Sequence, residues 1–235
     1  MIDLNCDLGE GLNNEHHIMP LITSCNIACG GHAGFAEIMD HSIRLAIENN
    51  VKIGAHPSFV DKENFGRVVL DISNEELQKS LCHQMALFQN RVSLQGGYIH
   101  HVKPHGALYN LIAVNQEKAV VVVEAIQKVF TAIKMYVPYN SVIARVAKEA
   151  NIEIVYEAFA DRNYNEDLTL VSRRKSNAIL MDPNEIIEHV SRMVNESKVK
   201  TISGLEKSIL AQTFCIHGDN SKAIEILQSL QSLQF

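Results

Sequence analysis

Short apolar runs alternate with longer stretches of helical periodicity along the whole chain. The apolar runs have the length and composition of buried strands, and we predict strands at 2–6, 21–27, 51–55, 98–102, 135–137, 152–156 and 214–216. Between them, apolar residues recur at the three- and four-residue spacing of a helix. We therefore predict helices at 35–49, 75–94, 119–130, 141–150, 182–195 and 222–233, with a short helical turn from Ala107.

This alternation predicts parallel β-α-β units in a single domain that spans residues 1–235. The sequence contains no internal repeat, low-complexity tract or flexible linker that would divide it. About seven strand–helix units in a chain of this length fit a β/α barrel, incomplete or distorted, better than the alternative of an open sheet. The predicted fold class is therefore α/β, with a distorted barrel.

Composition excludes several classes of function. Hydrophobic residues make up 46% of the chain, charged residues 20%, and the net charge is −6 without any basic run, so a nucleic-acid partner is not expected. No apolar run approaches the ~20 residues that cross a bilayer, and no signal-peptide pattern opens the sequence, so no membrane partner is expected. The five cysteines form no CxxC pair, which indicates buried reduced thiols in a cytoplasmic protein.

The segment Lys103-Pro104-His105-Gly106 follows a predicted strand and favours neither strand nor helix. Pro104 has no amide donor and biases Lys103 towards an extended conformation, while Gly106 allows a tight turn. A lysine and a histidine are thus expected at the carboxyl end of a strand, where ligands bind in parallel α/β folds. The alternative is a basic turn with a solvated lysine.

Polar and charged residues also follow the other predicted strands. Parallel strands would bring the loops that follow them to one end of the barrel. The alternative for some of these polar residues is a structural role, as solvated acids in a turn or as partners in a surface salt bridge. Four histidines with a lysine and several acids on one rim are nevertheless difficult to explain by stability alone. The candidate catalytic residues are Asp7, Glu10, His56, Lys103, His105, Glu157 and Asp219, and the candidate substrate-binding residues are Asn26, His32, Arg67, Asp161, Arg162 and His217.

These side chains suit a hydrolytic or amide-opening reaction. Carboxylates serve as general bases and imidazoles transfer protons near neutral pH, while Lys103 would hold a carboxylate or an oxyanion beside His105. A divalent metal is also compatible, with Asp7, His56 and His105 as candidate ligands, although no HExxH-type spacing is present. The sequence has neither a GxGxxG nor a GxSxG motif, which disfavours a dinucleotide site and a serine hydrolase. Of the other histidines, His101 is the least certain to be structural.

Six segments resemble the LamB/YcsF family, the A subunit of bacterial 5-oxoprolinase. They are DLNCDLGEG (3–11), ITSCNIACGGHAG (22–34), IGAHPS (53–58), VKPHGALYN (102–110), EAFADRNY (157–164) and CIHGD (215–219). The resemblance implies a distorted seven-stranded β/α barrel similar to that of the polysaccharide deacetylases. It also implies ATP-dependent opening of 5-oxo-L-proline to L-glutamate together with subunits B and C. Loop positions such as Gly31, Phe35 and Val68 depart from the family pattern and leave open another lactam or cyclic amide as substrate.

Two other functions remain open: a metal-dependent deacetylase or amidohydrolase that acts without ATP, and a non-catalytic scaffold subunit. ATP is expected to act through the complex, because the nearest phosphate-loop-like stretch, Gly204-Leu205-Glu206-Lys207-Ser208, lacks the first glycine and carries an acid beside the lysine.

Overall fold

Seven parallel strands close into a barrel in this computed structural model, which describes residues 2–232. The strands are β1 (Leu4–Leu8), β2 (Ser24–Ala28), β3 (Lys52–His56), β4 (Ile99–Val102), β5 (Lys134–Pro138), β6 (Glu153–Phe159) and β9 (Thr213–His217). The last of them, β9, lies between β6 and β1 and pairs with both, as in Leu4 opposite Phe214 and Glu157 opposite Thr213. The predicted barrel is confirmed, and the open sheet is wrong.

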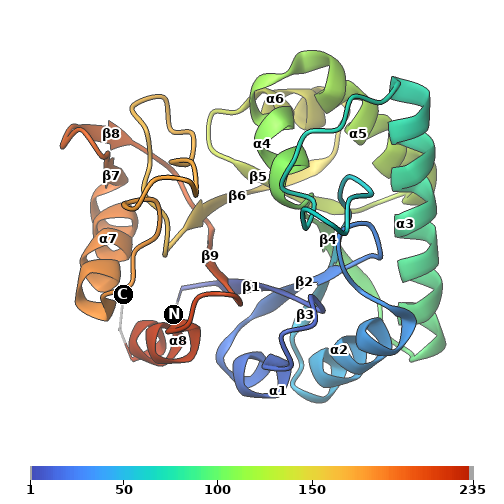
Figure 1. Ribbon diagram of the computed structural model, residues 1–235, viewed down its shortest axis with the longest axis horizontal. Helices are drawn as coiled ribbons and strands as arrows, with labels where there is room; N and C mark the ends of the chain where they lie inside the picture. The colour runs from blue at the N-terminus through green and yellow to red at the C-terminus, as the bar shows by residue number, and fades with distance from the viewer. Residues whose placement is uncertain (1, 233–235) are drawn as a thin grey trace.

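Helices cover the outside of the barrel (Figure 1). They are α1 (Glu15–Ile18), α2 (Ala36–Glu48), α3 (Asn74–Leu94), α4 (Gly106–Val114), α5 (Gln116–Val129), α6 (Val142–Glu149), α7 (Pro183–Glu196) and α8 (Ala223–Gln231), with a 3₁₀ turn at Met19–Leu21. In Figure 1, α2 to α6 lie on one side, and α7 lies on the other side with the hairpin of β7 (Lys198–Lys200) and β8 (Glu206–Ser208). None of the helices within residues 2–232 is long and apolar enough to cross a membrane.

Local sequence explains where the helices begin. The Ser73 side chain accepts a hydrogen bond from the Glu76 amide and the Glu76 carboxylate accepts one from the Ser73 amide, which forms a capping box at the start of α3. Asp182 caps α7 by accepting from two amides of its first turn, and Pro183 occupies the first helical position, where no amide donor is needed. Both helices therefore start as the sequence predicts.

The structure differs from the prediction in several segments, among them the short turn expected from Ala107, which is the nine-residue helix α4. The first strand, expected at 2–6, runs from Leu4 to Leu8, so that Asp7 is a strand residue. The second, expected at 21–27, begins only at Ser24, because residues 15–21 form α1 and the 3₁₀ turn. The β7–β8 hairpin was not expected, because its strands have three residues each and lack a readable alternation.

A chain of hydrogen bonds joins polar side chains inside the barrel. Asn5 donates to Thr213 Oγ1 (2.8 Å), Asn26 donates to Asn5 Oδ1 (2.8 Å), and His101 Nε2 lies 2.7 Å from Asn26 Oδ1. The His101 ring stacks on Tyr136, 3.7 Å between centroids. All five side chains are buried, and burial without partners would cost several kcal/mol, so this network ties β1, β2, β4, β5 and β9 together.

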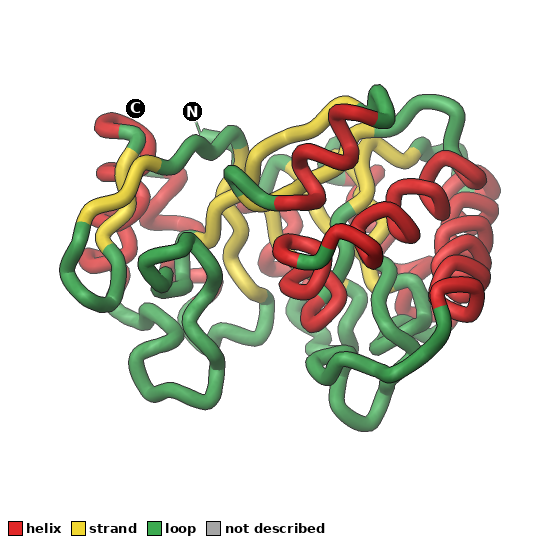
Figure 2. Tube along the Cα trace, turned by 90° about the horizontal axis from the view of Figure 1, so that it is seen from above, coloured by secondary structure: helices red, strands yellow, loops and turns green. Residues whose placement is uncertain are grey.

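Parallel strands place the loops that follow them at one end of the barrel. Figure 2 shows the long loops gathered on one side of the molecule. The segments 57–73 and 160–182, which follow β3 and β6, belong to this end. The candidate residues identified after the strands therefore belong to the same end of the fold.

Gly54 is required by the barrel interior, because a Cβ at this position would collide with the imidazole of His101. We expect Gly54→Ala to push His101 away from Asn26 and to lower the free energy of unfolding by about 3 kcal/mol, from overpacking and a lost buried hydrogen bond. Gly97→Ala is the matched control, since its Cβ would meet only the ends of Val92 and Ile47 and one backbone oxygen at 3.1–3.4 Å. Urea unfolding of both variants measures the difference, and equal losses would contradict this account.

Candidate active site

The ammonium of Lys103 is buried at the carboxyl end of the barrel and surrounded by protein groups. Its Nζ lies 2.9 Å from Asp7 Oδ1, 2.9 Å from Glu157 Oε1 and 3.0 Å from Cys215 Sγ. These partners come from β1, β6 and β9, while Lys103 follows β4. Only 1% of Lys103 is exposed, so its ammonium is held by two carboxylates and a thiol, not by solvent.

Opposing effects set the protonation of this cluster. Burial alone would lower the pKa of Lys103, but Asp7, Cys215 and Glu157 outweigh burial and raise that pKa well above its usual range. Burial would likewise raise the pKa of Asp7, but His56 and Lys103 hold it well below its usual range. The floor of the site is therefore an ammonium held between two carboxylates, and the role of Lys103 in holding a substrate carboxylate or an oxyanion stays a prediction.

His56 and His105 form a hydrogen-bonded pair next to this cluster. His56 Nδ1 lies 2.6 Å from the Lys103 carbonyl, and His105 Nε2 lies 2.9 Å from the Phe65 carbonyl, so both of these nitrogens carry hydrogen. The inner nitrogens, His56 Nε2 and His105 Nδ1, face each other at 3.0 Å. His56 Nε2 also lies 3.3 Å from Asp7 Oδ2. A proton on His56 Nε2 can thus be shared between Asp7 and His105.

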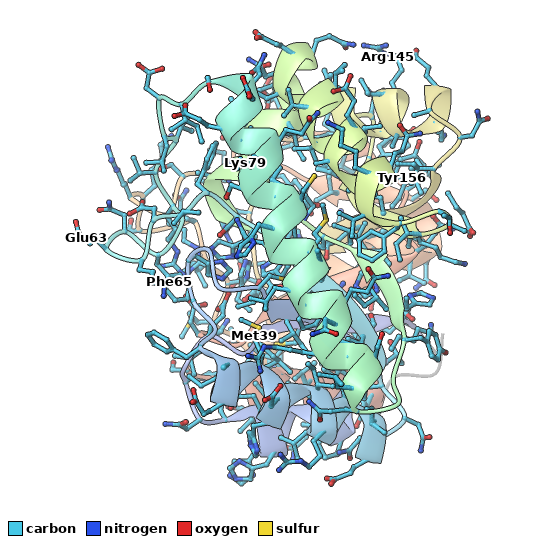
Figure 3. All side chains as sticks on the ribbon, turned by 90° about the vertical axis from the view of Figure 1, so that its right-hand side faces the viewer. Met39, Glu63, Phe65, Lys79, Arg145 and Tyr156 are labelled. Carbon is cyan, nitrogen blue, oxygen red and sulfur yellow. The ribbon has the colours of Figure 1, made fainter. Side chains whose placement is uncertain are left out.

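The loop that follows β3 supports this pair from outside. Figure 3 shows Phe65 and Glu63 on that loop, to one side of α3. The Phe65 backbone is in the left-handed region (φ 55°), and the carbonyl of Phe65 accepts the hydrogen of His105 Nε2. Gly66 brings the same loop against the His105 ring, since a Cβ there would lie 3.0 Å from His105 Cδ2. The loop therefore fixes the orientation of His105.

Glu10 and His32 complete a group of possible metal ligands. One ligand atom each from Glu10, His32, His56 and His105 lies within 4.8 Å of the others. The outer nitrogens of His56 and His105 are bound to carbonyl oxygens, which is how metal-ligating histidines are usually oriented. Burial and His56 lower the pKa of His32 to about 2, so His32 is neutral, as a metal ligand must be. The residues present fit a divalent cation, with His32 and Glu10 in place of the expected Asp7.

Tyr109 extends the cluster on the side of Glu157. Its hydroxyl donates to Glu157 Oε2 at 2.8 Å. Burial and the neighbouring Glu157 raise the pKa of Tyr109 well above its usual range, so it remains a hydrogen-bond donor. Glu157 is thereby held between a phenol and the Lys103 ammonium.

These groups border a cavity of about 810 Å³. Asp219 lies on its wall and accepts from two arginines of different loops, Arg67 Nη2 (2.6 Å) and Arg173 Nη1 (2.9 Å). The predicted residues that line the cavity are Asp7, Glu10, His56, Arg67, Lys103, His105, Glu157, Arg162, His217 and Asp219.

Three predicted substrate-binding residues lie behind the cavity wall. Asn26 donates to Asp7 Oδ1 (2.8 Å), and Asp161 accepts from His217 Nδ1 (2.8 Å). His32 is stacked on His105 with 3.6 Å between ring centroids. Each of the three contacts a residue of the wall and is covered by it, so the prediction that His32 lines the cavity is wrong.

Sequence reasoning missed three residues of the site. Cys215 was assigned only as a buried thiol, although it stands two positions before His217 on the same strand and so shares its face. Tyr109 follows His105 by four residues and so lies one helical turn further on, a spacing that could have identified it. Arg173 lies in an irregular loop where no periodicity signals its direction.

Comparison with known proteins identifies relatives along the whole chain. The model of the LamB/YcsF family matches residues 2–234. The A subunit of 5-oxoprolinase from Bacillus cereus (strain Q1) is 40% identical over 235 residues, which is 97% of this chain and 93% of that protein, and the A subunit from Bacillus anthracis (strain A0248) matches equally. A lactam utilization protein from Thermus thermophilus is 32% identical and superposes with a TM-score of 0.90, over 98% of this chain and 96% of that one.

Removal of the Lys103 charge should destabilise the protein in a pH-dependent way. Lys103→Met leaves Asp7 and Glu157 buried without their cation, and we expect a loss of about 3–5 kcal/mol of unfolding free energy near pH 7.5. Without the cation, a buried carboxylate has a raised pKa in the folded variant. Its contribution to the unfolding free energy is therefore present below pH ~4 and is lost as pH rises through the raised pKa. In the wild type the pKa of Asp7 is lowered. Its contribution to the unfolding free energy is therefore present near neutral pH and is lost as pH falls through the lowered pKa.

The destabilisation by Lys103→Met should therefore be larger at pH 7.5 than at pH 5, as urea unfolding at the two pH values will measure. Lys52→Met is the control, because Lys52 pairs with Asp3 on the surface at 3.0 Å and should contribute less than ~1 kcal/mol. An equal loss at both pH values would show that the ammonium acts through packing alone.

Proposed function

We propose that this chain, which belongs to the LamB/YcsF family, is the A subunit of an ATP-dependent 5-oxoprolinase and opens 5-oxo-L-proline to L-glutamate together with subunits B and C. The curated relatives are named as A subunits of 5-oxoprolinase, and the structural relative from Thermus thermophilus is a lactam utilization protein. The observation that carries the proposal is the Lys103 cluster with its adjoining histidines on the floor of one cavity. The proposed location is the cytoplasm, where thiols stay reduced, since all five cysteines are free.

Ring opening of a lactam requires a base for water, a charge to stabilise the oxyanion, and an acid for the leaving nitrogen. Burial raises the pKa of Glu10, which makes its carboxylate a stronger base than an exposed glutamate. We assign Glu10 as the general base and His56, whose Nε2 lies between His105 Nδ1 and Asp7 Oδ2, as the acid that protonates the ring nitrogen. The Lys103 ammonium lies below the reacting carbonyl with Glu157 and Asp7 as its partners, and the oxyanion would share this ammonium with them.

The ATP-dependent step is assigned to the partner subunits. An unstrained lactam is a poor electrophile, so its hydrolysis needs activation. Lys207, the lysine of the nearest phosphate-loop-like stretch, lies on β8 of the hairpin and not at a helix start, where a phosphate cradle would need it. The proposed role of this chain is water activation and proton transfer on the activated lactam.

A reconstitution assay tests this division of roles. Glutamate release from 5-oxoproline should require this chain, subunits B and C, and ATP, and should fall to background when any one of them is omitted. Calorimetry on the isolated chain should detect no micromolar ATP binding. Glutamate formed by this chain with ATP alone, or tight binding of ATP to it, would refute the proposed division.

The assignment of Glu10 makes a separate prediction. Glu10→Gln should lower turnover of the complex by about 10²–10⁴-fold, the usual contribution of a positioned base. Glu149→Gln is the control, because Glu149 pairs with Arg145 on the exposed face of α6, away from the cavity lining. Unchanged turnover for both variants in a folded complex would support the scaffold function instead.

A metal-dependent deacetylase or amidohydrolase is the second candidate, favoured by the ligand atoms of Glu10, His32, His56 and His105 within 4.8 Å of one another. A divalent ion held there would lower the pKa of a bound water. Elemental analysis of the purified chain separates the two functions. Under the first proposal, a chain treated with chelator and dialysed should restore full activity to the complex with magnesium and ATP. A stoichiometric transition metal, together with ATP-independent amide hydrolysis that chelation abolishes, would favour the second.

A further inference from the structure

Arg162 is a buried cation without a carboxylate partner. It lies three residues after the end of β6, borders the cavity, and is only 5% exposed. Its Nε donates to the Ala178 carbonyl (3.2 Å) and its Nη2 to the Val171 carbonyl (2.5 Å). Among residues 2–232, no carboxylate lies within 4.0 Å of its guanidinium. A buried charge is normally paired, so this arrangement is one that an external anion would complete.

The acids closest to Arg162 are engaged elsewhere. Asp161, its neighbour in the chain, accepts from His217 and from Asn220 Nδ2 (3.2 Å). Asp219 is shared by Arg67 and Arg173. Burial and the nearby Arg173 lower the pKa of Arg162 to about 10, which still leaves the guanidinium charged at neutral pH.

The wall of the cavity around Arg162 is therefore basic. Arg67, Arg162, Arg173 and Arg174 all border the cavity, against Asp219 and an Asp167 carboxylate that is bound to Thr169 within its own turn. The chain as a whole carries a net charge of −6, so this local excess of arginines is opposite in sign to the charge of the protein. Concentrated positive charge of this kind attracts anions.

The floor of the same cavity has the opposite character. Lys103 is neutralised by Asp7 and Glu157, and Glu10 adds another acid. Phe159 borders the floor, because its ring lies 5.1 Å from Lys103 Nζ and stacks on His217 with 5.2 Å between centroids. An anionic ligand would meet acids on the floor and guanidinium groups on the wall, so its anionic group must face the wall.

We propose that Arg162, with Arg173 beside it, binds an oxyanion group of the ligand, namely the carboxylate of the lactam substrate. The identity of the ligand rests on the proposed function, whereas the anionic character of the site does not. Arginine suits this role because its planar guanidinium matches the two oxygens of a carboxylate. Bound in this way, the lactam ring lies over Phe159 and its amide points towards Lys103 and His56.

Calorimetry on the isolated chain tests this with three probes: 5-oxoproline, 2-pyrrolidinone, which is the same ring without the carboxylate, and inorganic phosphate. The wild type should bind 5-oxoproline at least about tenfold more tightly than 2-pyrrolidinone, the scale of a charge-assisted contact. Arg162→Met should remove that advantage and leave 2-pyrrolidinone binding unchanged. Arg145→Met, which removes an exposed arginine of α6, is the matched control and should bind all three probes like the wild type.

Phosphate distinguishes a carboxylate site from a phosphoryl site. Phosphate binding that exceeds 5-oxoproline binding and is lost in Arg162→Met would support the oxyanion site and assign it to a phosphoryl group. The proposal is overturned if folded Arg162→Met binds 5-oxoproline and phosphate like the wild type, or if the wild type binds neither.

Two further variants cover a failure of Arg162→Met to fold, which thermal unfolding would reveal. Arg162→Lys keeps the charge but loses the planar fork, and Arg173→Met changes a partly exposed side chain. Both should weaken 5-oxoproline binding by about three- to tenfold, and wild-type affinity in both would overturn the proposal. If the reconstituted complex releases no glutamate while Arg162-dependent anion binding persists, the proposed function fails and the anion site stands.

Discussion

The burial of one ammonium group, that of Lys103, is the constraint on which the carboxyl end of the barrel depends. Moving such a charge out of water costs several kcal/mol unless partners are already in place. Here the partners are Asp7, Glu157 and Cys215, each from a different strand. The register of β1, β6 and β9 must therefore be correct before the lysine can be buried at all. The interactions that hold the barrel end together are also the ones that create a charged, water-poor floor for chemistry.

The hydrogen-bonded polar side chains inside the barrel also have their partners in place, and they orient Asp7 from below the floor of the site. Asn26 contacts both Asn5 and Asp7, and His101 contacts Asn26 in turn. Every link is buried, so each side chain has little freedom to leave its partner. The Asp7 carboxylate is consequently oriented from behind by an amide and from the side by His56 and Lys103. Such preorganisation is what allows a small number of charges to act on a substrate without reorganising first.

The fold was largely predictable because strand and helix periodicities are local. Most helix bounds were correct to within about three residues, and the capping box at Ser73 fixed the start of α3. Short elements were not predicted. The strands β7 and β8 have three residues each, and the helix α1 has four residues and lies shortly before the predicted second strand. Most of the site residues predicted from their positions after strands do line the cavity, since parallel strands share a direction.

Side-chain direction was not predictable in the same way. His32 was expected in the cavity, yet its glycine-rich loop turns back so that Nδ1 contacts Ser58 and Nε2 contacts Glu10. Gly31 allows this, because a Cβ there would collide with Ser58 and Gln84. The partners are far away in the sequence, so no local pattern contains this information. The same holds for Lys103, whose neutralisation by Asp7 and Glu157 appears only when three strands are brought together.

The position of β9 in the barrel has a consequence for biosynthesis. Asp7 and Cys215, which meet at Lys103, are separated by 208 positions in the chain. While the polypeptide emerges from the ribosome, β1 and β6 have no strand between them until residues 213–217 have been made. From the synthesis of β6 until that of β9, the facing edges of β1 and β6 are open, and such edges favour pairing with other chains. The barrel and its chemistry therefore arise together, once β9 has been made.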